Sequence, residues 1–161
     1  MLTGGVDELN PLMMRGFKAA GQLRHYGRGF SEGSGMLVLE KSGHARQRGA
    51  AIRAEVENIR TIGSLVKGAE DEGVSRLLGV ATDHSLLSLS GFAAEFGMFL
   101  EKIPALPRLE TGKILGCSLA MGGLSMAALV LSLIPGQRAL HLAASPEGPY
   151  FAVDFNGGPT V

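Results

Sequence analysis

The chain has 161 residues, which is enough for one domain with a sizeable core. Fifteen basic and fifteen acidic residues balance to a formal net charge of zero, so charge gives no indication of binding to nucleic acid or to an anionic membrane. The single cysteine excludes an internal disulfide and suits a reducing cytoplasm, and the first ten residues lack the basic and apolar regions of a signal peptide.

The first half of the chain predicts alternating helices and strands. Asn10 is a helix cap followed by Pro11 at the first helical position, which predicts a helix to about Ala20, closed by Gly21. Alternation then places Ile52, Ala54 and Val56 on one face of a half-buried strand that starts at residue 50. The other expected elements are a glycine-rich loop, a buried strand, a polar helical turn or connection, and an exposed polar helix or loop, at residues 27–35, 36–40, 44–49 and 67–73.

The second half continues this pattern. The apolar run 76–81 predicts a second strand. Five large apolar residues at helical spacing predict a helix that starts near Ser88 or Ser90 and ends at Pro104 and Pro107; they are Phe92, Phe96, Phe99, Leu100 and Ile103. This stripe is typical of a helix face that packs into the core. The alternative is that it forms the wall of an acyl-binding pocket. Residues 138–144 and 150–155 predict two strands joined by a turn, so the chain is α/β with a mixed sheet.

Residues 114–134 carry no charge and follow Lys113 directly. This run could be a membrane span, the central helix of a core, or the wall of an active site with Cys117 at its mouth. Its helical part is about 17 residues or ~25 Å, which is marginal for a span of ~30 Å. No tryptophan or tyrosine anchors either end. These features favour a buried core helix that begins after Gly116 and stops at Pro135.

One segment resembles a known family. Residues 29–40 read GFSEGSGMLVLE, and residues 44–56 continue HARQRGAAIRAEV. Both resemble β-ketoacyl synthases, in which Gly-Phe precedes a Gly-Glu-Gly-Ala-Gly segment and a strand ending Leu-Val-Leu-Glu; this chain is two residues shorter after Phe30. The resemblance covers most of the chain but only the second half of the family, and is most specific at residues 29–56. It implies a thiolase-like fold, with residues 1–161 as a single carboxyl-terminal domain and the first half of the complete fold absent.

The resemblance also implies where catalytic residues would lie. Family members condense acyl thioesters with a nucleophilic Cys from the first half and two His. His84 matches the first His, with Glu95 eleven residues later, but the motif reads His-Ser-Leu in place of His-Gly-Thr. Lys113 and Gly116 match the second site, where Cys117 occupies the histidine position. The closing glycine-rich loop of the family would fall near residues 145–150, which read SPEGPY.

Each of these residues also has a purely structural interpretation. His84 could be a hydrogen-bonded histidine at the end of a strand, and Lys113 could end a strand and extend to water. Cys117 could be a reactive thiolate at a helix amino terminus, although a lone Cys beside small residues is more often inert. The histidines show no metal-binding spacing with the cysteine, and the glycine-rich loop precedes a strand, so we expect no metal and no nucleotide cofactor.

The retained scaffold and altered motifs predict a non-catalytic, chain-length-factor-like pseudoenzyme of fatty acid or polyketide biosynthesis. It would be cytoplasmic and would pair with another ketosynthase-like subunit or with itself, with acyl carrier protein as a further candidate partner. The alternative is the carboxyl-terminal half of an active split acyltransferase, in which His84 and Lys113 act with a Cys on another chain. A gene fragment is a third interpretation. The sequence does not identify the acyl substrate, its chain length or the partner.

Overall fold

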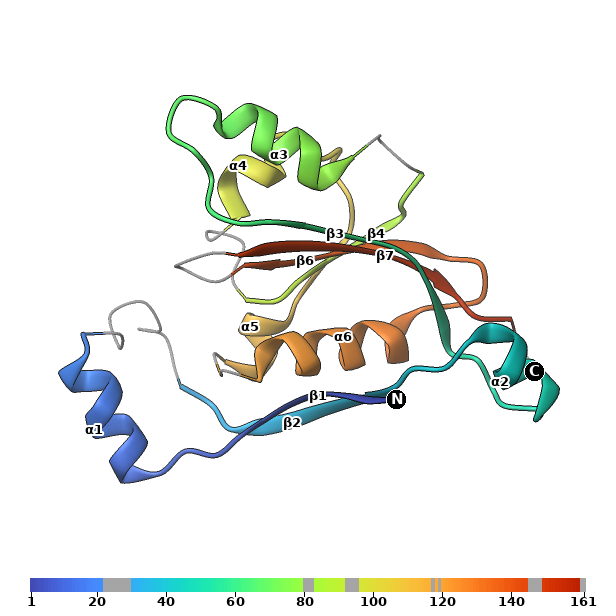
Figure 1. Ribbon diagram of the computed structural model, residues 1–161, viewed down its shortest axis with the longest axis horizontal. Helices are drawn as coiled ribbons and strands as arrows, with labels where there is room; N and C mark the ends of the chain where they lie inside the picture. Colours follow the sequence, from blue (N-terminus) through green and yellow to red (C-terminus); the bar gives the residue numbers. More distant parts are fainter. Residues whose placement is uncertain are drawn as a thin grey trace.

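The computed structural model describes residues 1–21, 30–79, 83–91, 96–116, 118, 120–144 and 149–159. In this part of the chain, a two-stranded sheet and a five-stranded sheet lie on opposite sides of helix α6 (Met121–Ser132), and further helices cover the far face of the larger sheet (Figure 1). The mixed α/β architecture confirms the predicted fold class. The second, two-stranded sheet was not predicted, and it places the central helix between two sheets.

The larger sheet has the strand order β3-β7-β6-β4-β5. Its strands are β3 (Ala54–Ile62), β4 (Leu86–Leu89), β5 (Arg108–Glu110), β6 (Arg138–Ala144) and β7 (Tyr150–Gly157). Strand β4 pairs in parallel with β5 and β6, whereas β7 is antiparallel to both β6 and β3. The predicted strand pair at 138–144 and 150–155 is therefore confirmed, with β7 two residues longer than expected.

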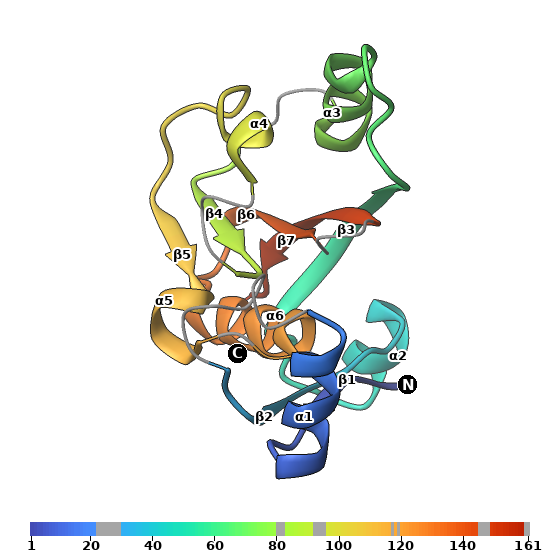
Figure 2. The same cartoon turned by 90° about the vertical axis from the view of Figure 1, so that its left-hand side faces the viewer.

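Both faces of this sheet are covered. One face packs against α3 (Glu70–Leu78) and the short α4 (Gly97–Leu100), through Leu77, Leu89 and Phe99. The other face packs against α6 through Leu129, which contacts apolar side chains of β6 and β7. Because alternate residues of each strand enter the two cores, the sheet is the central layer of the domain (Figure 2).

The smaller sheet packs closely on α6. Strands β1 (Leu2–Asp7) and β2 (Gly33–Val38) are antiparallel. A Cβ atom added to Gly35 would collide with the backbone of Gly123 and Leu124, and one added to Gly123 would lie 2.5 Å from the Gly35 carbonyl oxygen. Glycines on both sides therefore bring the two backbones into contact, which explains part of the high glycine content.

Two of the smaller expectations are confirmed, and three strand boundaries differ. Helix α1 (Pro11–Ala19) begins as predicted, because the Asn10 side chain accepts a hydrogen bond of 2.8 Å from the Met13 amide. Helix α2 (Ser42–Gln47) coincides with the predicted polar turn. Strand β2 begins inside the expected glycine-rich loop, of which residues 27–29 lie outside the described residues, and ends at Val38. Strand β3 begins at Ala54 rather than residue 50.

Two predicted elements are wrong. Residues 76–78 belong to α3 and not to a strand, because Val74 and Leu77 place one helical face against the sheet. Gly79 ends this helix at a φ of 68°, a conformation that glycine adopts without strain. Residues 86–89 form β4 and do not begin a helix. Phe96 and Phe99 do enter the core, as that prediction required, but α4 has only four residues; Phe92 lies outside the described residues.

The uncharged run is divided between two helices. Helix α5 (Thr111–Leu115) ends at Gly116, which has a φ of 74°, and α6 starts only at Met121. Within the described residues, no helix is both long and apolar enough to cross a membrane. The expected central helix is present, but it is shorter than predicted and not buried on every side, since Leu131 near its end is 79% exposed.

Candidate functional site

The carboxyl ends of the three parallel strands form the strongest candidate site. Strands β4, β5 and β6 point in one direction, so their carboxyl ends lie at one edge of the sheet. Helix α5 and the amino-terminal end of α6 lie at the same edge, which faces the viewer in Figure 2. Ligands of open α/β sheets bind preferentially outside the carboxyl ends of the strands.

The segments after β4 and β5 are locked together at this edge. The buried Thr111 hydroxyl donates a 2.8 Å hydrogen bond to the Leu89 carbonyl, and the Gly112 amide donates to the Gly91 carbonyl at 3.2 Å. A Cβ atom on Gly112 would lie 2.7 Å from that carbonyl oxygen. Gly91 itself has a φ of 141°, which a larger residue would adopt only with strain. The two segments are therefore held against each other by hydrogen bonds and close backbone packing.

Lys113, one of the residues that the resemblance placed at the catalytic positions, lies at this edge. Its ammonium group forms a 2.9 Å ion pair with the carboxylate of Glu110, and the lysine side chain is 66% exposed, whereas the glutamate is largely buried. The side chain therefore extends into solvent and is held by its own neighbour in sequence. This geometry agrees with the structural interpretation of Lys113 and leaves its predicted catalytic role untested.

Cys117 and Glu95 both lie outside the described residues. The described neighbours of Cys117 are Gly116 and Ser118, and the buried Ser118 hydroxyl accepts a hydrogen bond of 3.0 Å from the Ala120 amide. The predicted roles of Cys117 and Glu95 stay predictions.

His84 lies at the opposite end of the sheet from Lys113. It precedes β4, whereas Lys113 follows β5, the parallel neighbour of β4. The four residues of β4 span about 13 Å at ~3.3 Å per residue, so the backbones of His84 and Lys113 lie at opposite ends of the parallel strands. The expected preceding strand 76–81 is a helix over its first three residues. The residue that directly follows β4 is Ser90.

His84 instead belongs to a polar cluster on the α3 side of the sheet. Its Nε2 atom lies 3.1 Å from Oδ1 of Asp154, which is nearly fully buried on β7. Arg60 of β3 binds the same carboxylate through two nitrogens, at 2.5 and 2.9 Å, and its Nε donates a 2.6 Å hydrogen bond to the Leu77 carbonyl. The cluster therefore joins β3, β7 and α3 to the segment before β4.

The charges in this cluster set the protonation of its members. Burial lowers the pKa of His84 below its usual range, and the opposing attraction of Asp154 only partly offsets this. Burial would raise the pKa of Asp154, but the bonds and charge of Arg60, with the His84 contact, outweigh burial and hold that pKa below its usual value. At neutral pH the cluster is thus an Arg60–Asp154 ion pair beside a neutral histidine, which is typical of a structural tie.

A second buried histidine was not recognised as a candidate from the sequence. His141 lies in the middle of β6 on the α6 side of the sheet, and its Nδ1 atom is 3.0 Å from the Ser88 hydroxyl on β4. Its Nε2 atom has no hydrogen-bond partner within the described residues. Burial lowers the pKa of His141 to about 4. Its position between Leu140 and Leu142 in an alternating strand indicated the face, but no sequence motif indicated its pairing with Ser88.

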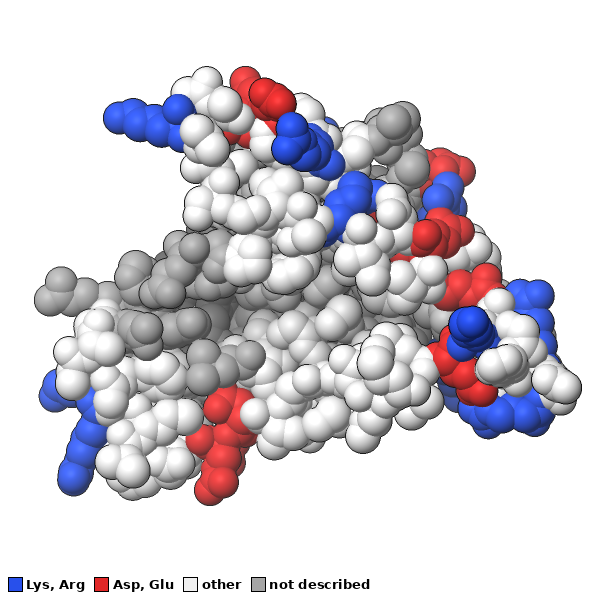
Figure 3. All heavy atoms as spheres, viewed as in Figure 1, with Lys and Arg blue, Asp and Glu red and all other residues white. Residues whose placement is uncertain are grey.

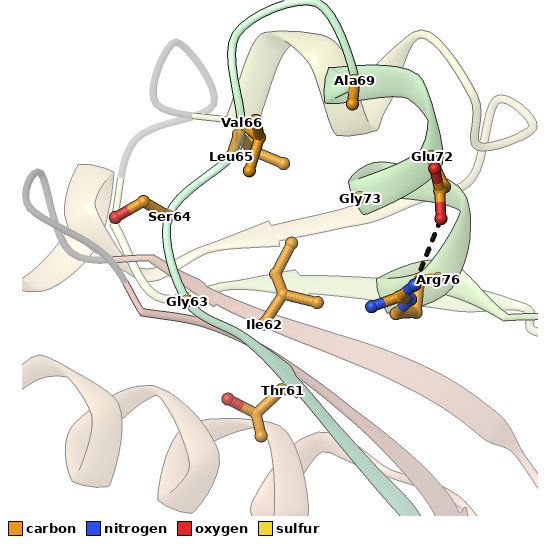
Figure 4. Close-up of a pocket in the computed structure, with 10 residues that line it drawn as sticks. All are labelled: Thr61, Ile62, Gly63, Ser64, Leu65, Val66, Ala69, Glu72, Gly73 and Arg76. Atoms are coloured by element: carbon orange, nitrogen blue, oxygen red, sulfur yellow. Dashed lines mark hydrogen bonds and ion pairs between the residues drawn. The ribbon is translucent and has the colours of Figure 1, made fainter.

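A surface groove lies on the other side of the domain, between the end of β3 and α3. It encloses about 450 Å³ and is lined by Thr61, Ile62, Gly63, Ser64, Leu65, Val66, Ala69, Glu72, Gly73 and Arg76 (Figure 4). Its charged groups, Glu72 and Arg76, pair at 3.1 Å, and both side chains are about three-quarters exposed. The lining contains no histidine, cysteine or buried charge, so it offers no group suited to catalysis.

Comparisons with known proteins identify the fold. No family model and no curated protein matches the sequence. Among solved structures, the chain is similar to a chain of the AntDE:AntF complex, a type II polyketide synthase acyl-carrier protein with its ketosynthase bound to the hexaketide. The identity is 19%, the TM-score is 0.73, and the match covers 98% of this chain and 50% of the other.

Two further structures extend this likeness. AbyA1, a tetronic acid condensing enzyme, is 16% identical with a TM-score of 0.53, over 83% of this chain and 55% of that one. The dimeric peroxisomal thiolase of Saccharomyces cerevisiae is 18% identical with a TM-score of 0.50, over 79% and 36%. The chain spans about half the length of the first two structures. It therefore has a thiolase-like fold, corresponding to part of the fold of condensing enzymes.

Proposed function

We propose that this chain is a non-catalytic ketosynthase-like subunit of fatty acid or polyketide biosynthesis, which acts beside another ketosynthase-like chain. The observation that carries the proposal is the match of nearly the whole chain to half of a chain in a polyketide ketosynthase complex, at a TM-score of 0.73. That complex also includes an acyl-carrier protein, which makes such a carrier a candidate partner here. Because one fold hosts many functions, the fold alone does not establish a non-catalytic role, and the residues at the candidate site must be considered as well.

The chemistry available at the carboxyl ends of the strands supports a non-catalytic role. Condensation of thioesters needs a nucleophile and groups that stabilise an oxyanion. Among the described residues that directly follow β4 and β5, Lys113 is the ionisable one, and it is exposed and paired with Glu110. The resemblance would place a histidine directly after a strand, and Ser90 occupies the position after β4.

The alternative, an active split ketosynthase, requires His84 and Lys113 in one site with a cysteine from another chain. Their placement before and after the parallel strands argues against a shared site. The contacts of His84 with Asp154 also give it a structural role that needs no substrate. The proposal includes no metal and no cofactor; within the described residues, no group of three His, Cys, Asp or Glu side chains is placed to bind a metal ion.

The test uses the ketosynthase encoded nearest to this chain in its genome. We expect the purified chain to bind that ketosynthase in a pull-down and to form no condensation product when supplied alone with acyl and malonyl thioesters of the carrier protein. Condensation by this chain alone would refute the non-catalytic role. Failure to bind any ketosynthase or carrier protein would refute the proposed subunit function.

A further inference from the structure

The outward face of the two-stranded sheet is apolar and uncovered. Residues of β1 and β2 alternate between α6 and solvent, and the solvent-facing set is Leu2, Gly4, Val6, Ser34, Met36 and Val38, here called the outer face. Its four large side chains are 46 to 71% exposed. In Figure 1, no described element lies directly beneath this sheet; α1, beyond the end of β1, reaches lower at the left.

Two physical features indicate that another surface covers this face. A sheet of two strands is only marginally stable by itself, and a contiguous exposed apolar patch commonly marks an interaction site. The five-stranded sheet, by contrast, has helices on both faces. The outer face is thus a sheet surface with four large exposed apolar side chains and no covering layer among the described residues.

The arrangement of side chains on the outer face is complementary to itself. The antiparallel register places Leu2 opposite Val38, Gly4 opposite Met36, and Val6 opposite Ser34. If two copies stack face to face about a two-fold axis along the strands, β1 of each copy lies over β2 of the other at the same row. Met36 then lies over the hollow at Gly4 of the second copy. Val6 likewise lies over the small Ser34, so two of the three rows pair a large side chain with a small one.

Charge also favours a second copy as the occupant. The outer face has no ionisable side chain, so stacking would bury no unpaired charge. Charged residues lie beyond its ends, including Glu8 after β1 and Lys41 after β2, where they would form a polar rim. Figure 3 shows the lower edge of the molecule uncharged between charged groups at either end. The chain as a whole has a net charge of zero, so two copies do not repel each other strongly.

We propose that two copies of this chain form a two-fold symmetric dimer through the outer face, in which the paired β1–β2 sheets make a four-stranded sandwich. Each α6 would then lie behind its own pair of strands, and the four large apolar side chains of each copy would be buried between them. The dimer does not depend on the proposed function, since it follows from the face alone.

Sedimentation velocity of the purified chain across a wide concentration series tests this dimer. We expect a dimer for the wild type and for the control Ile59→Lys, which alters a 65% exposed residue of β3 outside the outer face. Met36→Lys places a charge in the interface, and Ser34→Phe fills the hollow for Val6 without a charge; both should be monomeric, with the far-ultraviolet circular dichroism of the wild type.

Three results would overturn the proposal. The first is a wild type that stays monomeric at every concentration. The second is a dimer that persists in both Met36→Lys and Ser34→Phe. The third is a chain that is monomeric alone and uses the outer face only to bind a different polypeptide.

Discussion

Protonation of His141 should make the fold sensitive to mild acid. The buried ring has a pKa of about 4, compared with 6.5 for an unperturbed histidine. Above pH 6.5 the ring is neutral in both the folded and the unfolded chain, so it causes no pH dependence. Below pH 6.5 the unfolded chain binds a proton that the folded chain does not, so the free energy of unfolding decreases as the pH falls towards 4.

The size of this effect follows from the difference between the two pKa values. A difference of about 2.5 pH units corresponds to about 3.4 kcal/mol, at 1.36 kcal/mol per unit. Between pH 6.5 and 4, the free energy of unfolding should therefore fall by about 1.4 kcal/mol for each pH unit because of His141. Other groups add to the total, including His84, whose pKa is also lowered by burial.

A double variant isolates the contribution of His141. His141→Leu removes the titrating ring, and Ser88→Ala removes the hydroxyl that would otherwise lose its partner. Urea unfolding at a series of pH values gives the free energy of unfolding for the wild type and the variant, and His84 is unchanged in both. We expect the difference between the two curves to be constant above pH 6.5 and to change steadily below it. A difference that stays constant down to pH 4 would refute the assignment of a buried, neutral His141.

Three further substitutions test separate contacts by urea unfolding or hydrogen exchange. Gly123→Ala should destabilise the fold by about 1–3 kcal/mol, because its Cβ would meet the Gly35 carbonyl. The control Gly122→Ala, which has open space in the same helix, should stabilise the fold slightly. Equal effects of the two substitutions would contradict the packing of β2 on α6. Asp154→Asn should lower the free energy of unfolding by about 3 kcal/mol, because Arg60 loses its buried partner. The control Glu72→Gln, which alters an exposed ion pair, should have almost no effect. Similar losses in both variants would show that the Arg60–Asp154–His84 cluster does not stabilise the fold. Asn10→Ala should speed amide exchange in α1 through a loss of about 1 kcal/mol, and unchanged exchange at Met13 would contradict the observed cap.

Elements with strong local signals could be predicted from the sequence. Asn10 and Pro11 define the start of α1, because the cap and the fixed proline φ act within one turn. Strands β6 and β7 were predictable because apolar runs flank a segment rich in turn residues. The thiolase-like fold followed from a resemblance at residues 29–56, which include β2, α2 and the first residues of β3.

Elements whose structure depends on tertiary contacts were not predicted correctly. The run RLLGVA has the composition of a strand, but the acidic residues before it and the spacing of Val74 and Leu77 continue one helix through Leu78. The segment Leu86–Leu89 is too short to be recognised by period, and it becomes a strand because β5 and β6 supply hydrogen bonds on both sides. The uncharged run breaks at Gly116, where a positive φ ends α5.

The placement of the candidate site residues also depends on tertiary contacts, which local sequence patterns do not show. Lys113 lies at the edge of the sheet formed by the carboxyl ends of the parallel strands, because it follows β5, which pairs with β4. Its catalytic role stays a prediction. His84 was matched to the family by its spacing from Glu95 and by a strand expected before it. Residues 76–78 of that expected strand are helical, and His84 precedes β4. The pairing of His141 with Ser88 joins residues 53 positions apart, so no local pattern could reveal it.

The most direct test of the central claim is the condensation activity of a complex between this chain and its ketosynthase. Two variants of the complex are compared, one with His84, Lys113 and Cys117 of this chain replaced together by Gln, Gln and Ser, and one with the nucleophilic cysteine of the ketosynthase replaced by alanine. We predict that the first complex assembles and forms product at the rate of the wild type, whereas the second forms none. Loss of product formation in the first complex, with assembly intact, would contradict a non-catalytic role for this chain.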